Sequence, residues 1–249
     1  MCLLAWSWEP ETDHPFTLIG NRDEFYARPT QSLHWWDDKV LAGRDLQEGG
    51  TWLGISRQGK LAVLTNYRDP RLSRSNVLSR GHLVAEFLRN DGTLESYLEH
   101  LCAVSQSYNP FNLLLYDGTK LKGFESRHAK IVDIGPGIGG LSNADFNSPW
   151  PKLKTLKGQL KSSFENGLAD NSYFMSLLQN STPAADGELP NTGISIERER
   201  DLSSCFVRMP EYGTRASSIV RVSRKEVSFI EQSYDSKGIT DLNEFISRI

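Results

Sequence analysis

The sequence predicts an α+β protein built from stacked antiparallel sheets with helices on their outer sides. Two observations support this class. Strand-like segments follow one another through short turns, whereas helix-like segments occur in two separate pairs, which is typical of sheets that pair locally and are covered by helices. The strand-like segments are also apolar on both faces, so each sheet should be covered on one side by the other sheet and on the other by helices.

The chain is expected to begin with a hairpin. Residues 2–8 alternate with apolar side chains on both faces, and residues 16–20 provide the returning strand. Residues 21–25 are then expected to form a polar turn, which the hairpin brings beside Cys2. Residues 26–37 are expected to be a loop rich in aromatic side chains.

A second hairpin and two helices follow. Short apolar runs at residues 51–56 and 61–68 flank a Gln-Gly turn signal. Ser79 is the expected N-cap of the first helix and Thr93 that of the second, because apolar residues with helical spacing follow each of them.

The second half of the chain repeats this order of strands, helices and strands. Residues 135–140 match G-x-G-x-x-G, but no helix follows them, so we reject a dinucleotide site there. The other expected elements are strands at 111–116, 120–125, 129–134, 203–208, 215–222 and 226–232, helices from Ser148 and Asp170, and a short helix from Asp241.

Composition indicates an ordinary soluble protein with a single domain spanning residues 1–249. The chain has 38% hydrophobic and 24% charged residues, a formal net charge of -3 and a pI near 6.0. Its Lys and Arg residues are scattered, so nucleic acid is not expected as a partner. The three cysteines lie far apart and form no C-x-x-C pair, which favours a reducing, cytoplasmic location. No segment is apolar enough for a signal peptide or a membrane span.

Cys2 is the first candidate catalytic residue. Initiator methionine is normally trimmed when a small residue follows, so the mature chain is expected to begin with Cys2. Its thiol and a free α-amino group then share one residue, which places a nucleophile beside a base. A small buried apolar residue is the alternative interpretation of a free cysteine, and position alone leaves it open.

Polar residues follow the expected strands near this nucleophile. Arg22 can stabilise a thiolate, and the carboxylate of Asp23 or Glu24 can hold the α-amino group. Asn66 and Asn143 each end an apolar segment, and an asparagine amide at a strand end can donate to an oxyanion. A solvated turn is the alternative for the charged residues.

Aromatic residues gather at His34, Trp35 and Trp36. The two tryptophans either pack within the loop or form the wall of a pocket. His34 is a candidate ligand for a metal or a haem iron, although a lone histidine is usually just a hydrogen-bonded side chain. We predict no metal site.

Several motifs together resemble one family over essentially the whole chain. The chain is similar to the NRDE-motif family, which comprises the transport and Golgi organisation proteins and their bacterial relatives. The segments that carry this resemblance are Met1-Cys2, Asn21-Arg22-Asp23-Glu24, Ala42-Gly43-Arg44-Asp45, Gly50-Thr51-Trp52-Leu53-Gly54, Leu64-Thr65-Asn66-Tyr67-Arg68 and Tyr212-Gly213-Thr214-Arg215.

That family more distantly resembles the N-terminal-nucleophile hydrolases of the choloylglycine hydrolase and penicillin V acylase group. The resemblance implies an αββα sandwich in which a mature N-terminal cysteine attacks an amide carbonyl. Cys2 matches that nucleophile, and Asn66 and Asn143 match the two asparagines of the oxyanion site and amino-group network.

The second-strand motif departs from the hydrolase pattern. Those hydrolases have Arg-x-x-Asp after a glycine, whereas this chain has Asn21-Arg22-Asp23-Glu24. Either the arginine is displaced by one residue, or Asn21 and Glu24 occupy the two places. Because a slip of one residue turns a side chain to the other face of a sheet, the resemblance implies the fold more directly than the activity.

Two functions follow as hypotheses. The first is a cysteine amidohydrolase that cleaves non-peptide C–N amide or thioester bonds of an apolar small molecule without a cofactor. The second is a non-catalytic carrier of haem or of a lipid or acyl-coenzyme A, because relatives are associated with haem trafficking and with lipid and acyl-coenzyme A homeostasis. The residues expected to hold such a ligand are Asn21, Trp35, Trp36 and Trp52, with Arg22, Arg44 or Arg215 at the rim and Cys2 or His34 as a possible axial haem ligand.

Overall fold

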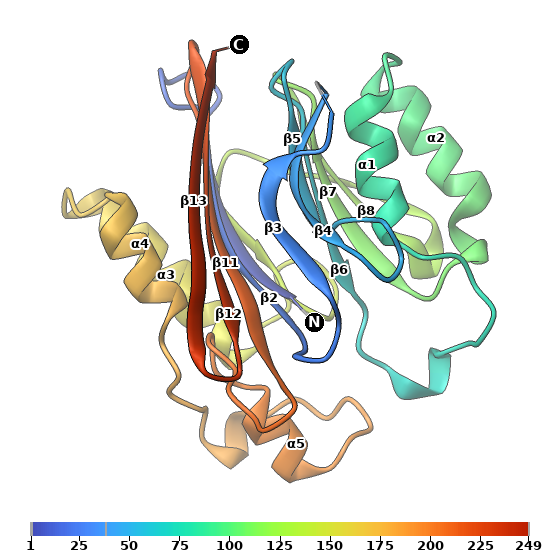
Figure 1. Cartoon of the computed structure of the whole chain (residues 1–249), viewed down its shortest axis with the longest axis vertical. Coiled ribbons are helices and arrows are strands. Elements are labelled where there is room, and N and C mark those ends of the chain that lie inside the picture. Colours follow the sequence, from blue (N-terminus) through green and yellow to red (C-terminus); the bar gives the residue numbers. More distant parts are fainter. Residues whose placement is uncertain (1, 38, 249) are drawn as a thin grey trace.

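The computed structural model describes residues 2–37 and 39–248 as two antiparallel sheets packed face to face (Figure 1). The strands of the first sheet are β1 (Cys2–Trp8), β2 (Phe16–Phe25), β10 (Gly137–Leu141), β11 (Tyr212–Val222), β12 (Glu226–Asp235) and β13 (Gly238–Arg248). Those of the second are β3 (Thr30–Trp35), β4 (Val40–Asp45), β5 (Leu53–Ser56), β6 (Leu61–Asn66), β7 (Phe111–Tyr116), β8 (Leu121–Glu125) and β9 (Lys130–Asp133). The first sheet has the order β10-β1-β2-β11-β12-β13, and the second runs from β3 to β9 in chain order.

Helices cover the outer face of each sheet. They are α1 (Gly81–Arg89), α2 (Leu94–Val104), α3 (Pro151–Glu165) and α4 (Asn171–Leu178), whereas the short α5 (Ile196–Asp201) lies beyond one end of the sheets (Figure 1). Figure 1 shows α1 and α2 outside the second sheet and α3 and α4 outside the first. The predicted αββα sandwich of two antiparallel sheets flanked by helices is therefore confirmed.

Three apolar layers hold the sandwich together. Trp6 and Phe229 lie between the sheets, Phe87 joins α1 to the second sheet, and Leu156 and Phe174 join α3 and α4 to the first. Each of these side chains is at most 1% exposed. Burial of one such side chain contributes roughly 1.5–3 kcal/mol. Both faces of each sheet are thus covered, as the apolar character of the strands predicted.

The polar segment after the first hairpin is part of a strand rather than a turn. β2 continues through Phe25 because β11 pairs with its other edge from Phe25 back to Phe16. This long-range pairing extends the strand past the end of its apolar run. The expected turn at residues 21–25 is therefore wrong, and its side chains alternate between the two faces of the sheet.

Other sequence predictions differ from the structure in the edge strands and the loops. Residues 26–37 include β3. The expected C-terminal helix from Asp241 is instead β13, whose pairing with β12 at ten positions overrides the local capping signal. Residues 203–208 form no strand. Helix α1 begins one residue later than expected, with Arg80 rather than Ser79 at the N-cap position, and α3 begins two residues later, with Trp150 rather than Ser148 there.

The rejected dinucleotide motif forms β10, which pairs with β1 at the edge of the first sheet. A Cβ atom at Gly139 would lie 2.3 Å from the ring of Trp6. The glycine run therefore leaves room for an indole.

Candidate active site

Cys2 lies at the tip of β1 and faces the space between the two sheets. It pairs directly with Arg22 of β2, and Arg22 pairs on its other side with Ala216 of β11. Residues directly opposite each other in antiparallel strands share a face. The Cys2 thiol and the Arg22 side chain therefore belong to the same inner face of the first sheet.

A pocket of about 310 Å³ opens between the sheets at this end of the sandwich. Its lining is strongly charged, with both signs represented. The charged and catalytic candidates in the lining are Cys2, Arg22, Asp23, Glu24, Arg28, Arg44, Asp45, Glu48, Asn66, Arg80, Arg215 and Glu231, and Trp52 is the tryptophan among them.

The alternation of β2 divides the NRDE segment between two environments. Arg22 and Glu24 point into the pocket, where their side chains approach to 3.7 Å. Asn21 points toward the helices, where its Nδ2 donates to the carbonyls of Leu178 and Cys205 at 2.8 Å each. Asp23 is two residues further along the strand, so its side chain lies on the same face as that of Asn21, and it is fully buried.

Asp23 is held by the first residues of β11. Thr214 Oγ1 donates to Asp23 Oδ1 at 2.8 Å, and the Tyr212 hydroxyl donates to the Asp23 carbonyl at 3.0 Å. Burial lowers the pKa of the nearby Lys152, and the negative charge of Asp23 opposes this effect. Asp23 thus connects the strand beside Cys2 to a buried polar region under α3.

The environment of Cys2 favours the neutral thiol. Burial raises the pKa of this thiol to about 11, and the positive charge of Arg22 acts in the opposite direction. Asp23 and Glu24 also raise the pKa of the thiol. A reactive thiolate at neutral pH therefore requires a base beside the sulfur, and the α-amino group of a mature Cys2 is such a base.

Arg80 is a pocket cation that the sequence analysis did not single out. It precedes α1 without capping it, and its guanidinium donates to the carbonyl of Pro110 at 3.1 Å. Burial lowers the pKa of Arg80, whereas the charges of Cys2 and Glu24 raise it. A cation is unfavourable at a helix N-terminus, and this misplaced charge was the signal in the sequence.

The two asparagines have different positions. Asn66 ends β6 and lines the pocket, but Asn143 is fully buried and its Nδ2 donates to the carbonyl of Asn66 at 2.8 Å. The neighbouring Ser142 hydroxyl donates to the carbonyl of Cys2 at 3.1 Å. Asn143 and Ser142 thus hold the backbone of the two residues that face the pocket.

Trp35 and Trp36 do not belong to the pocket lining, so the expectation that they form a wall of this pocket is wrong. Trp36 Nε1 donates to the carbonyl of Ala42, and its ring lies 4.7 Å from the Arg44 guanidinium. Trp35 lies instead against Arg57. Trp52 does line the pocket, as expected.

His34 also lies outside the pocket lining. Its Nδ1 contacts the carbonyl of Ser32 at 2.7 Å and therefore carries the proton. Of the two residues named as axial haem ligands, only Cys2 faces the pocket. Within residues 2–37 and 39–248, no three His, Cys, Asp or Glu side chains gather as a metal-binding group.

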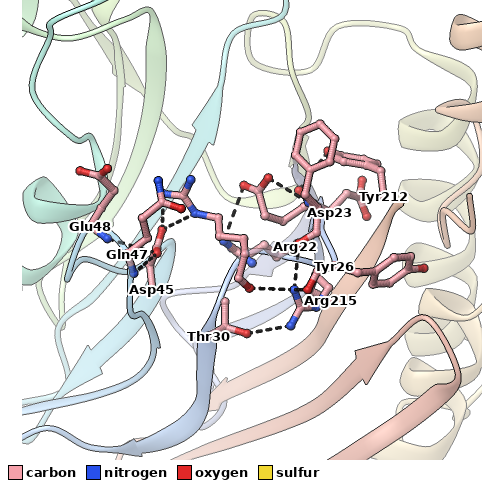
Figure 2. Close-up of polar contacts among 12 residues, drawn as sticks. Arg22, Asp23, Tyr26, Thr30, Asp45, Gln47, Glu48, Tyr212 and Arg215 are labelled. Carbon is pink, nitrogen blue, oxygen red and sulfur yellow. Dashed lines mark hydrogen bonds and ion pairs between the residues drawn. The ribbon is translucent and has the colours of Figure 1, made fainter. Parts of the chain in front are cut away.

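The rim arginines are held by the protein itself. The Arg215 guanidinium donates to the carbonyls of Phe25, Tyr26, Arg28 and Tyr234 and to the Thr30 hydroxyl, so it fastens the turn between β2 and β3 (Figure 2). Arg28 pairs with Asp45 at 2.7 Å. Arg44 is exposed, and its Nε donates to the carbonyl of Gly49.

The family model described as Transport and Golgi organisation 2 matches residues 1–236. The chain belongs to this family. It is 38% identical to the Transport and Golgi organization protein 2 homolog of Bos taurus, over 94% of this chain and 93% of the relative. It is 33% identical to the Homo sapiens homolog, over 96% and 95% of the two chains.

Family membership confirms the resemblance carried by the sequence motifs. Among solved structures, the chain is similar to a mutant of the conjugated bile acid hydrolase from Clostridium perfringens, with a TM-score of 0.55, 9% identity, and coverage of 100% of this chain and 96% of the other. This similarity shows that the chain has an N-terminal-nucleophile-hydrolase-like fold. In the described part of the chain, no helix is both long and apolar enough to cross a membrane.

Proposed function

We propose that the protein is a cysteine amidohydrolase that acts on a non-peptide amide or thioester through Cys2. The observation that carries this proposal is the position of Cys2 at a strand tip, on the inner face of a charged pocket, with Arg22 directly opposite on the neighbouring strand. A small buried apolar residue needs neither the cation nor the pocket. The N-terminal-nucleophile-hydrolase-like fold is consistent with this role.

The reaction uses the two groups of a mature N-terminal cysteine. The α-amino group takes the thiol proton, and the sulfur forms a bond to the substrate carbonyl carbon. The Asn66 side chain and the nearby cations stabilise the resulting oxyanion. The C–N bond then breaks, and the ammonium returns its proton to the leaving amine. Water attacks the remaining thioester, which releases the acid and regenerates the thiol.

The neighbours of Cys2 support this sequence of steps. Glu24 is on the pocket face and Asp23 on the helix face, and the charges of both act on Cys2, so either carboxylate can orient the α-amino group. Arg22 counteracts the burial that keeps the thiol neutral. Ser142 fixes the Cys2 carbonyl.

The test is hydrolysis of octanoyl amides and thioesters by purified protein. Cys2→Ala should lower turnover by a factor of at least about 1,000, because the nucleophile is lost. Cys102→Ala is the matched control, since that cysteine lies in α2 away from the pocket. Equal turnover by Cys2→Ala and the parent would refute the proposal.

A non-catalytic carrier is the second candidate, and one observation favours it. The pocket has five arginines in its lining, and the thiol within it has a pKa of about 11. Arginines suit the carboxylates of haem or the phosphates of an acyl-coenzyme A. Saturable haem binding that survives Cys2→Ala, with transfer to an apo-haemoprotein and no hydrolysis by the parent, is the result this candidate requires.

A further inference from the structure

Glu231 is a buried carboxyl in the pocket that the reaction does not use. It lies in β12, where Val227, Phe229 and Glu231 alternate on the inner face of the first sheet. The first two belong to the apolar layer between the sheets, but Glu231, 3% exposed, lines the pocket. An acid that follows two buried apolar residues on this face requires a reason.

The contacts of Glu231 only partly satisfy its carboxylate. Leu33 N–H of β3 donates to Oε1 at 2.8 Å, whereas the contact from the Ser218 hydroxyl to Oε2 is 3.5 Å long. The carboxylate lies against Gly43 of β4, where a Cβ atom would be 3.2 and 3.3 Å from its two oxygens. An ionised carboxylate accepts up to four hydrogen bonds, so this one is short of donors in a buried site.

Glu231 is too far from Cys2 to take part in the same bond cleavage. Cys2 lies on β1 and Glu231 on β12, with β2 and β11 between them. Three strand spacings amount to about 14 Å. Both residues line the pocket, and on the two strands between them its lining includes Arg22 of β2 and the small side chain of Ala216 of β11. A ligand whose carbonyl meets Cys2 therefore has room to extend toward Glu231.

We propose that Glu231 is a specificity-determining residue that binds a hydrogen-bond donor, a hydroxyl or an ammonium group, at the end of the ligand remote from Cys2. The ligand supplies the donor that the second carboxylate oxygen lacks. Its class is then an ω-hydroxy or ω-amino acyl compound rather than a simple fatty acyl compound. The inference rests on the proposed function for the orientation of the ligand, but its test measures binding and needs no turnover.

The competing explanation is structural. Glu231 also links the two sheets, because it reaches from β12 to Leu33 of β3. In that case its replacement lowers stability but does not change which ligand the pocket prefers. Ligand preference therefore separates the two roles.

The experiment compares the binding of octanoate, 8-hydroxyoctanoate and 8-aminooctanoate by calorimetry at pH 8. The parent should bind both donor-bearing acids about tenfold more tightly than octanoate, as expected for a hydrogen bond to a buried charge. Glu231→Gln should lose the preference for 8-aminooctanoate, because its amide keeps an acceptor for Leu33 and turns toward the ligand an NH₂ group, from which an ammonium cannot accept a hydrogen bond. Glu48→Gln is the matched control, since Glu48 lines the same pocket but is exposed.

Gly43→Ala provides a second variant that retains the charge. Its methyl group pushes against both carboxylate oxygens, so the preference should fall while octanoate binding changes little. Equal affinity of the parent for the three acids, or an unchanged preference in Glu231→Gln, would overturn the inference. Repeating the series in Cys2→Ala separates the two proposals, because the preference should persist there even though hydrolysis is absent.

Discussion

The two faces of β2 differ sharply although one four-residue segment supplies both. On the inner face, Arg22 and Glu24 reach a pocket and contact each other at the long distance of 3.7 Å. On the helix face, Asn21 makes short hydrogen bonds to two carbonyls and accepts one from the Ser217 hydroxyl at 2.7 Å. The helix face thus supplies hydrogen bonds that stabilise the fold, whereas the pocket face presents charged side chains to the cavity. Each prediction below tests this division.

Asn21→Ala should have the largest effect on stability. It leaves two buried carbonyls and a hydroxyl without their partner, so the free energy of unfolding should fall by about 3 kcal/mol or more. Glu24→Gln should change it by less than about 1 kcal/mol, because its ion pair is partly exposed. Urea unfolding measures both, and equal losses would contradict the division of roles.

Glu231 should make stability depend on pH. Burial raises its pKa in the folded protein to about 7, above the ordinary value of 4.5. Since the folded state holds this proton more tightly, the protonated carboxyl contributes to the free energy of unfolding. This contribution is complete below about pH 4.5 and is lost as the pH rises through 7. Relative to Glu231→Gln, the parent should lose on the order of 3 kcal/mol across this window. Parallel stability curves for the two proteins would show that the carboxyl does not titrate in this way.

Replacing Arg22 and replacing Asp23, neighbours on β2, should change the reactivity of the Cys2 thiol in opposite directions. Arg22 lowers the pKa of Cys2 and Asp23 raises it. At pH 8, Arg22→Gln should slow alkylation of Cys2 by iodoacetamide about threefold, and Asp23→Asn should accelerate it by a similar factor. Circular dichroism establishes that both variants are folded. Rate changes in the same direction would indicate that access, not charge, controls the thiol.

The architecture could be predicted because it depends on local patterns. Apolar character on both strand faces required coverage on both sides, and the helices fell in the expected pairs. The end of β2 could not be predicted in this way, because the pairing of β11 with Phe25 and its neighbours comes from the other end of the chain. The expected helix at Asp241 failed for a different reason, because hairpin pairing with the preceding strand β12 overrides the local capping signal.

The candidate site was predictable in its residues but not in their orientation. Cys2, Arg22, Glu24 and Asn66 do meet in one pocket. Their separation from the helix-facing Asn21 follows only once the strand is known to continue. Among the pocket residues that were missed, two left a signal: Arg80 is a cation at a helix start, and Glu231 is an acid that follows Val227 and Phe229 on one face of its strand.

The most direct test of the account is intact-mass analysis of the protein after reaction with p-nitrophenyl octanoate, followed by peptide mapping. We expect the mature chain to lack Met1 and to carry one octanoyl group on Cys2 within the first turnover, and we expect Arg22→Gln to acquire it more slowly. A chain that retains Met1, or that carries the acyl group on Cys102 or nowhere, would contradict the assignment of Cys2 as the nucleophile.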